Sequence, residues 1–218
     1  MADNAELLKA LADEIRGCKA CRLYEQATNS VPGAGHPNAE VMFIGEGPGY
    51  NEDKQGLPFV GQSGQYLDYL LNLINLKRET VFIANVVKHR APDNRDPLPD
   101  EIQACCGFLD RQEQIIDPLV IVTLGRFSMA RYFPNAKITA IHGKPKYETR
   151  RACLPLFHPA AVLRNPGLRR DMEADFKRIP ELVAEMKQRR QSAAPAPSSE
   201  GPKPSEPPSE PPVQLKLF

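Results

Sequence analysis

The sequence lacks the features of a membrane or exported protein. No apolar run in its 218 residues is long enough to span a bilayer, so we expect no membrane partner. The segment from Met1 to Glu6 lacks the basic and apolar regions of a signal peptide, which predicts a cytoplasmic protein. Net charge is also nearly absent, at +1, and says nothing by itself about a polyanionic partner.

Cysteine is scarce, with five in the chain. In a reducing cytoplasm, paired cysteines bind metal more often than they form disulfides. Cys18 and Cys21 form a CxxC pair, and His89 precedes Cys105 by sixteen positions across a proline-rich loop. These four residues could supply three thiolates and one imidazole to a single metal centre. Spacing alone favours zinc. Cys106 could replace Cys105 as a ligand, and His89 could instead be a core histidine.

Hydrophobic periodicity predicts strands that alternate with helices. The expected strands cover residues 40–45, 81–87, 119–125 and 152–158. The expected helices cover residues 4–16, 64–76 and 99–117, a short stretch after residue 125, and residues 167–187. Such alternation indicates an α/β fold with a parallel sheet covered on both faces. Ligands bind at the carboxyl ends of parallel strands, where Gly45, Asn85 and His158 are expected to gather.

The composition changes after the last expected helix. Residues 188–213 hold eight of the 22 prolines together with Ser, Ala and Glu, which predicts a disordered linker. The chain thus divides into a domain at residues 1–187, the linker, and an apolar peptide at residues 214–218. We find no internal repeats.

Several short motifs follow one another along residues 5–187. They are Cys18-x-x-Cys21, Gly45-Glu46-Gly47-Pro48-Gly49, Glu52-Asp53, Gly56-x-Pro58-Phe59-Val60-Gly61, Asn85-Val-Val-Lys88, Asn94-Arg-Asp-Pro97, Cys105 and His158-Pro-Ala-Ala-Val-Leu-Arg164. In this order they resemble the family 4 uracil-DNA glycosylases, the iron–sulfur branch of that superfamily. The resemblance implies a three-layer α/β/α sandwich around a four-stranded parallel sheet. It also implies a bacterial DNA repair enzyme that hydrolyses uracil from DNA and leaves an abasic site.

The resemblance changes the expected metal from zinc to a 4Fe–4S cluster, held by Cys18, Cys21, His89 and Cys105. The family's usual third ligand is cysteine, whereas this chain has His89. A related branch that attaches covalently to uracil-containing DNA is similar at this position. A protein that captures uracil-DNA without turnover therefore stays the alternative, although the short loop after His89 lacks that branch's basic insertion. A zinc-bearing nucleotide-binding regulator that uses the Gly45 loop is a further alternative.

The resemblance also implies roles for the residues at the strand ends. The catalytic set would be His158 as the stabiliser of the uracil anion, with Glu52 and Asn94 on the water side. The uracil-binding set would be Glu46, Gly47, Phe59 and Asn85, with Phe59 stacking on the base and Asn85 reading its edge. Arg164 would bind the DNA backbone.

The terminal peptide resembles the pentapeptide by which bacterial repair proteins bind the sliding clamp. Its expected contacts come from Gln214, Leu215, Leu217 and Phe218. After a long proline-rich linker, these apolar side chains have no core to enter, which favours a partner-binding peptide. We expect the protein itself to be a monomer.

Overall fold

The computed structural model describes residues 3–193 and is built around a six-stranded sheet with the order β1-β3-β2-β4-β6-β5. Its four inner strands run parallel: β3 (Phe82–Asn85), β2 (Val41–Gly45), β4 (Val120–Leu124) and β6 (Ala152–Leu156). Two short strands pair antiparallel at the edges: β1 (Ala34–Gly35) and β5 (Lys146–Tyr147). The predicted α/β class is confirmed, but the expected count of four strands is wrong, because two-residue edge strands leave no periodic signal.

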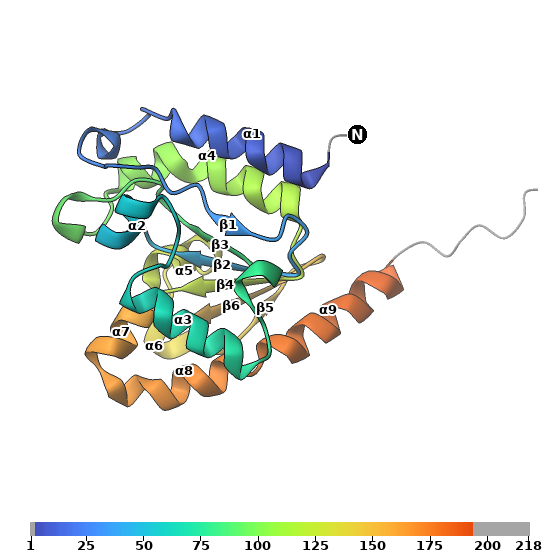
Figure 1. The fold of residues 1–218 in the computed structure, drawn as a ribbon. Helices are drawn as coiled ribbons and strands as arrows, with labels where there is room; N and C mark the ends of the chain where they lie inside the picture. The colour runs from blue at the N-terminus through green and yellow to red at the C-terminus, as the bar shows by residue number, and fades with distance from the viewer. Residues whose placement is uncertain (1–2, 194–218) are drawn as a thin grey trace, which may run out of the picture.

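Helices cover both faces of the sheet, as Figure 1 shows. One layer contains α1 (Asn4–Arg16) and α4 (Pro99–Ile116), and the opposite layer contains α3 (Gln62–Leu73), α8 (Arg169–Phe176) and α9 (Ile179–Ala193). In β2, Phe43 packs with the second layer and Met42 with the first. Strands buried on both faces explain the unbroken apolar runs in the sequence.

The last predicted helix is divided in two. A 3₁₀ turn at Pro166–Leu168 leads into α8, and a second helix, α9, begins at Ile179. Pro180 has no backbone N–H to continue a helical ladder from α8, but it is tolerated in the first turn of α9. That helix continues to Ala193, beyond residue 188, where the linker was expected to begin. The other long helices, α1, α3 and α4, lie within two or three residues of their expected bounds.

Shorter elements connect the layers, and most of them were not predicted. They are α2 (Tyr50–Gln55), α5 (Arg126–Tyr132), α6 (Ile138–Ile141) and α7 (Pro159–Arg164), with 3₁₀ turns at Arg22–Glu25, Arg78–Thr80 and Pro92–Asn94. Only α5 was expected, as a short helix after residue 125. Along residues 3–193, no helix is long and apolar enough to cross a membrane. Residues 194–213 of the expected linker lie outside the described residues, and so do the predicted partner-binding residues: Gln214, Leu215, Leu217 and Phe218.

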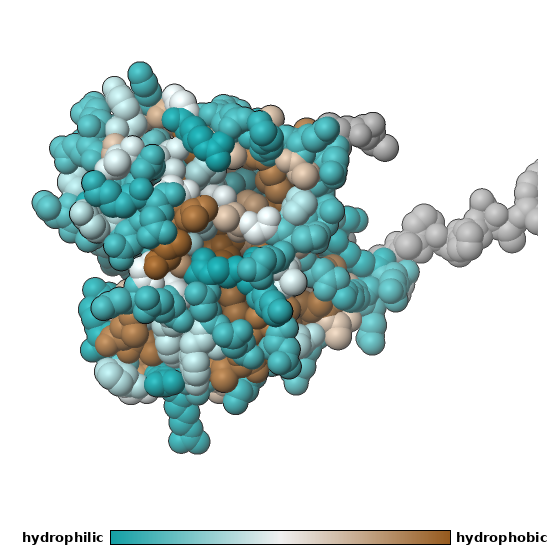
Figure 2. All heavy atoms as spheres, viewed as in Figure 1, coloured by the Kyte–Doolittle hydropathy of each residue, from teal (hydrophilic) through white to brown (hydrophobic). Residues whose placement is uncertain are grey.

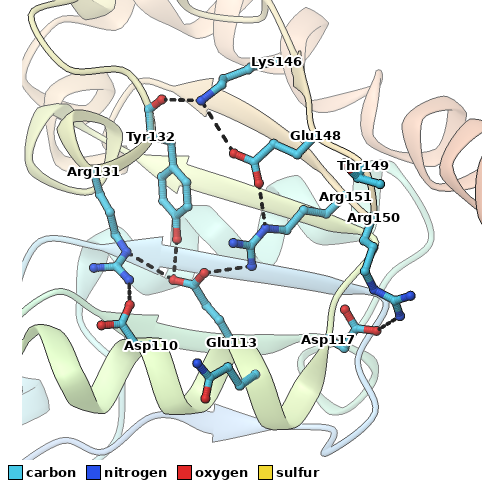
Figure 3. Close-up of a pocket in the computed structure, with 11 residues that line it drawn as sticks. Asp110, Glu113, Asp117, Arg131, Tyr132, Lys146, Glu148, Thr149, Arg150 and Arg151 are labelled. Carbon is cyan, nitrogen blue, oxygen red and sulfur yellow. Dashed lines mark hydrogen bonds and ion pairs between the residues drawn. The ribbon is translucent and has the colours of Figure 1, made fainter.

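The amino-terminal edge of the inner strands is closed by paired charges. A cavity of about 670 Å³ lies there, and Figure 3 shows its side chains. Glu113 is buried and accepts hydrogen bonds from Tyr132 Oη at 2.6 Å, Arg131 Nε at 3.2 Å and Arg151 Nη1 at 2.8 Å. Nearby, Arg150 pairs with Asp117 at 2.6 Å. Because the opposite charges are matched within this network, we assign it to stability rather than to ligand binding.

Candidate functional site

The carboxyl ends of the inner strands open onto a cavity of about 780 Å³. Gly45 and Asn85 are partners where β2 and β3 end, and β4 and β6 end at Leu124 and Leu156. The loops after these strands form the cavity wall. All eight residues predicted for catalysis, uracil binding and DNA binding line it: Glu46, Gly47, Glu52, Phe59, Asn85, Asn94, His158 and Arg164. The tertiary structure therefore brings together positions that are far apart in the sequence.

Asn85 presents a buried acceptor that has no partner in the described chain. Its side chain is 1% exposed, and Oδ1 makes no hydrogen bond. A Cβ at Gly45 would lie 2.4 Å from Asn85 Oδ1 and 2.6 Å from the Phe59 ring, so only glycine allows both groups to approach. Leaving such an oxygen unpaired costs about 1–3 kcal/mol, which an N–H of a bound ligand would offset.

His158 caps the amino terminus of α7 and has one tautomer. Its Nδ1 accepts a hydrogen bond from the Ala160 backbone N–H at 3.1 Å, so the neutral ring carries its proton on Nε2. Burial lowers the pKa of His158 to about 4, and the positive charge of Arg164 acts in the same direction. The ring centroid lies 5.8 Å from that of Phe59. His158 is therefore an uncharged N–H donor at neutral pH.

One carboxylate oxygen of Glu52 is hydrogen-bonded to the backbone. Its Oε1 accepts hydrogen bonds from the backbone N–H groups of Val60 and Gly61, each at 2.8 Å, and the residue is 8% exposed. Its Oε2 lies where a Cβ at Gly49 would come within 2.7 Å. Glu52 therefore fixes the loop that contains Phe59 and keeps one carboxylate oxygen for another contact.

The side-chain oxygen of Asn94 accepts a hydrogen bond that fixes the orientation of its amide. Arg90 Nε donates to Asn94 Oδ1 at 2.8 Å, which leaves the amide nitrogen as the group that can donate into the cavity. The guanidinium of Arg90 also lies 5.3 Å from the ring centroid of Tyr50, whose side chain is 56% exposed. An exposed aromatic side chain with a stacked cation thus borders the cavity.

Glu46 occupies a more charged part of the wall. Burial and the nearby carboxylate of Asp96 raise the pKa of Glu46, while Arg126 and Arg164 oppose that rise. Asp96 also pairs with Arg126. Neither Arg126 nor Asp96 was predicted as a site residue. Asp96 lies inside the motif Asn94-Arg-Asp-Pro97 without an assigned role, and Arg126 does not stand out from the other charged residues of the sequence. Figure 2 shows that the face in view is mostly hydrophilic, with hydrophobic residues exposed between the two helical layers.

Three of the four predicted metal ligands lie close enough to interact electrostatically. Burial raises the pKa of Cys105 to about 11, and the neighbouring Cys21 and Cys18 contribute to that rise. Burial also raises the pKa of Cys21. A hydrogen bond from a backbone N–H lowers the pKa of each thiol: from Lys88 at Cys105 and from Leu23 at Cys21. The Ala20 N–H likewise donates to Cys18 Sγ at 3.5 Å. Such N–H···S contacts fit the sulfur environment of an iron–sulfur cluster.

His89 is less clearly part of this thiol group. It is 6% exposed; burial lowers its pKa, and its charged neighbour is Asp53. Along residues 3–193, no three His, Cys, Asp or Glu side chains form a metal site as they stand. Cys106 differs from Cys105, because its Sγ contacts Gln103 O on its own helix at 3.0 Å.

A buried lysine for which no role was predicted connects the two parts of the site. Lys88 is 0% exposed, and its Nζ donates to Asn85 O at 2.9 Å and to Gln112 Oε1 at 2.8 Å. Gln112 and Cys105 both lie on α4. In the sequence, Lys88 ends the motif Asn85-Val-Val-Lys88 and directly follows an apolar strand. Neither feature identifies a buried cation.

The comparisons with known proteins agree with this arrangement. The model of the uracil DNA glycosylase superfamily matches residues 32–181. The type-4 uracil-DNA glycosylase of Sulfurisphaera tokodaii is 48% identical over 186 residues, covering 81% of this chain and 84% of that protein. That of Saccharolobus solfataricus is 45% identical over 84% of this chain and 88% of its own. That of Thermotoga maritima is 39% identical over 84% of this chain and 98% of its own. The chain belongs to the uracil DNA glycosylase superfamily, and within it to the type-4 group.

The lowered pKa of His158 predicts a specific pH dependence of stability. The unfolded chain takes up a proton on this histidine below about pH 6.5, whereas the folded chain does so only near pH 4. The free energy of unfolding should therefore fall as the pH drops from 6.5 to 4, by up to about 3 kcal/mol. Denaturant titrations of the wild type and of His158→Gln should differ in pH slope across this window. Parallel slopes would contradict the assignment, and the other histidines cancel in the comparison.

Proposed function

We infer that this protein hydrolyses the N-glycosidic bond of uracil in DNA and leaves an abasic site. The observation that carries the inference is the buried Oδ1 of Asn85, which has no hydrogen-bond partner among residues 3–193 and lies in a cavity that also contains the Phe59 ring and the neutral His158 donor. Membership of the superfamily and the type-4 relatives support the same activity. The enzyme is accordingly a DNA repair glycosylase.

Asn85 supplies the base specificity. A base that reacts inside a closed pocket must leave the duplex, and it is recognised there by stacking and by its Watson–Crick edge. Asn85 Oδ1 accepts from N3–H of uracil, and its amide nitrogen donates to O4. Cytosine has no N3–H and carries an amino group at position 4. Its N3 acceptor would therefore face the Oδ1 acceptor, and its amino donor would face the donor nitrogen of the amide. Phe59 stacks on the ring, while Gly47 and Glu46 complete the pocket.

His158 acts on the leaving group. As the bond from the sugar to uracil N1 breaks, negative charge develops on the base, including O2. The Nε2–H of His158 donates to O2, and a preorganised donor of this kind typically contributes 10²–10³-fold in rate. An imidazole that stays neutral remains a donor across physiological pH. Arg164, on the same short helix, binds a phosphate of the DNA strand.

A water molecule must attack the sugar as it gains positive charge. We assign this side of the reaction to Glu52 and Asn94. Glu52 Oε1 is held by two backbone N–H groups, so Oε2 is the atom that can orient the water or stabilise the sugar cation. Asn94 presents its amide nitrogen, because Arg90 occupies its oxygen.

The substitution Asn85→Asp tests the activity and its specificity together. Both aspartate oxygens accept, so one of them would face uracil O4 with no proton between them. We expect uracil release to fall by about 10²-fold or more and some cytosine release to appear. Release of free base from labelled single-stranded oligonucleotides measures both. Asn51→Asp makes the same chemical change on an exposed residue of the cavity wall and should keep uracil specificity. Unchanged specificity in Asn85→Asp would refute the assignment.

The same assay separates turnover from capture. Excision gives free uracil and alkali-labile DNA in amounts that exceed the enzyme. A protein that traps uracil-DNA would instead form a denaturation-resistant adduct, at most one for each chain, and such a result would replace the proposed activity.

Glu52→Gln distinguishes the charge of this residue from its contact with the loop. Glutamine keeps an oxygen acceptor for the N–H groups of Val60 and Gly61 but removes the negative charge. We expect a melting temperature close to that of the wild type, with a rate about 10–10²-fold lower, because the positive charge on the sugar loses its partner. Glu52→Ala should lower both. A full rate in Glu52→Gln would restrict Glu52 to holding the loop.

We propose that Cys18, Cys21, His89 and Cys105 hold a 4Fe–4S cluster. Support comes from the three interacting thiols and from the N–H groups directed at their sulfurs. When bound, the cluster is structural: it joins the amino-terminal segment to the loop that carries Asn94. Three thiolates with one imidazole are a ligand set that iron–sulfur centres accept.

Metal analysis of anaerobically purified protein tests this ligand set. We expect about four iron and four sulfide ions per chain. Cys105→Ala should lose the iron, whereas Cys106→Ala, the adjacent control, should keep it. His89→Cys should also keep it, since cysteine is the usual ligand there. Stoichiometric zinc without iron would overturn the proposal, and iron retained in His89→Ala would exclude His89 as a ligand.

We propose further that Gln214, Leu215, Leu217 and Phe218 bind a sliding clamp of the bacterial kind, and that the protein acts as a monomer. The support is the sequence, in which apolar residues follow a proline-rich segment. Replacing Leu215, Leu217 and Phe218 with alanine should abolish clamp binding in a titration, because the apolar contacts are lost. Lys216→Ala should bind normally. Uracil release from a short oligonucleotide should not change in either variant. Equal clamp affinity in all of them would end this hypothesis.

A further inference from the structure

Phe59 has a backbone conformation that its residue type does not favour. Its φ angle is +52°, in the left-handed region, although it is not glycine, and it is 5% exposed. A bulky residue there is under strain, and such strain persists only where the surroundings impose it. Residues in this state often belong to functional sites. The contacts around Phe59 should therefore reveal what holds its ring in place.

Arg78 holds the carbonyl groups of this segment. It lies in the 3₁₀ turn Arg78–Thr80, and its guanidinium donates to Pro58 O at 3.0 Å, to Phe59 O, and to Gly64 O at 3.4 Å. Its Nε pairs with Asp68 at 2.5 Å, which orients the planar group. Arg78 is not among the cavity-lining residues of the described chain, so it acts from behind the wall.

The amide groups of the same segment are held from the other side. Glu52 Oε1 accepts the N–H groups of Val60 and Gly61 at 2.8 Å. Gly64 packs so closely that a Cβ there would lie 1.7 Å from Phe59 O. Three sets of contacts therefore hold Phe59 in place. Glu52 accepts from two backbone N–H groups, Arg78 donates to three carbonyl oxygens, and Gly64 packs against the Phe59 carbonyl.

We propose that Arg78 is a positioning residue that keeps the Phe59 ring ready to stack on the extrahelical base. Without the guanidinium, the carbonyls of Pro58 and Phe59 are free to turn, and the strained φ can relax to negative values. The ring would then leave its place against Gly45 and Asn85. The proposal rests on the stacking role of Phe59 proposed above, and it places a specificity determinant outside the pocket.

A double-mutant cycle on the full-length protein tests this. Two quantities are measured for Arg78→Ala, Phe59→Ala and the double variant. They are kcat/KM for uracil release and the strength of inhibition by free uracil. We expect Arg78→Ala to reduce kcat/KM about 10–10²-fold, in the range that misplacing an active-site group produces, and to weaken inhibition by uracil. The double variant should be no slower than Phe59→Ala, because the two residues act through one contact. Losses that multiply would overturn the proposal.

Two further variants separate positioning from general stability. Arg190 also donates to three backbone carbonyls, those of Arg150, Asp117 and Pro118, but at the opposite edge of the sheet. Arg190→Ala should lower the melting temperature yet leave uracil inhibition unchanged. Arg78→Lys keeps the charge beside Asp68 but not the planar fork, so it should not restore kcat/KM. It also carries the cycle if Arg78→Ala does not fold.

The outcomes distinguish two failures. A full rate in Phe59→Ala would refute the stacking role itself. A slow Phe59→Ala beside a fully active Arg78→Ala, or full rescue by Arg78→Lys, would refute the positioning role and leave Phe59 in place.

Discussion

The parallel pairing of β2 with β3 is the constraint on which the site depends. It sets Gly45 beside Asn85 at the end of both strands, and the missing side chain of Gly45 leaves room for the Asn85 amide and the Phe59 ring. A shift of one residue in this register would turn Asn85 to the other face of the sheet. The arrangement of Gly45, Asn85 and Phe59 in the cavity wall is thus a consequence of strand pairing more than of any loop.

The ionisable side chains of the cavity wall are held in defined states and positions by burial and hydrogen bonds. His158 is kept neutral by burial, so its Nε2–H can meet a negative leaving group. Glu52 has a fixed position in the wall because its Oε1 accepts hydrogen bonds from two backbone N–H groups. Lys88 joins the end of β3, at Asn85, to α4, the helix that carries Cys105. The pocket and the thiol group are therefore two parts of one packed unit.

The motifs made much of the site predictable, because residues at the ends of parallel strands must share one edge of the sheet. This is why Gly45, Asn85 and His158 could be predicted to lie together. The helix α4 could also be predicted, because Pro99 and an acidic first turn are typical of the start of a helix. The break between α8 and α9 and the short edge strands were not foreseen, because they produce no sustained periodicity.

What the sequence determined by itself was the fold class, the order of the four inner strands and of the helices α1, α3 and α4 along the chain, and the set of polar residues at the strand ends. Only the tertiary structure decided which of their atoms remain available: the tautomer of His158, the free oxygen of Glu52 and the unpaired oxygen of Asn85. It alone revealed that Arg78 grips the backbone of Phe59, nineteen residues away. The physical reason is that hydrogen-bond partners and strain depend on contacts between distant segments, whereas periodicity and motifs report only local preferences.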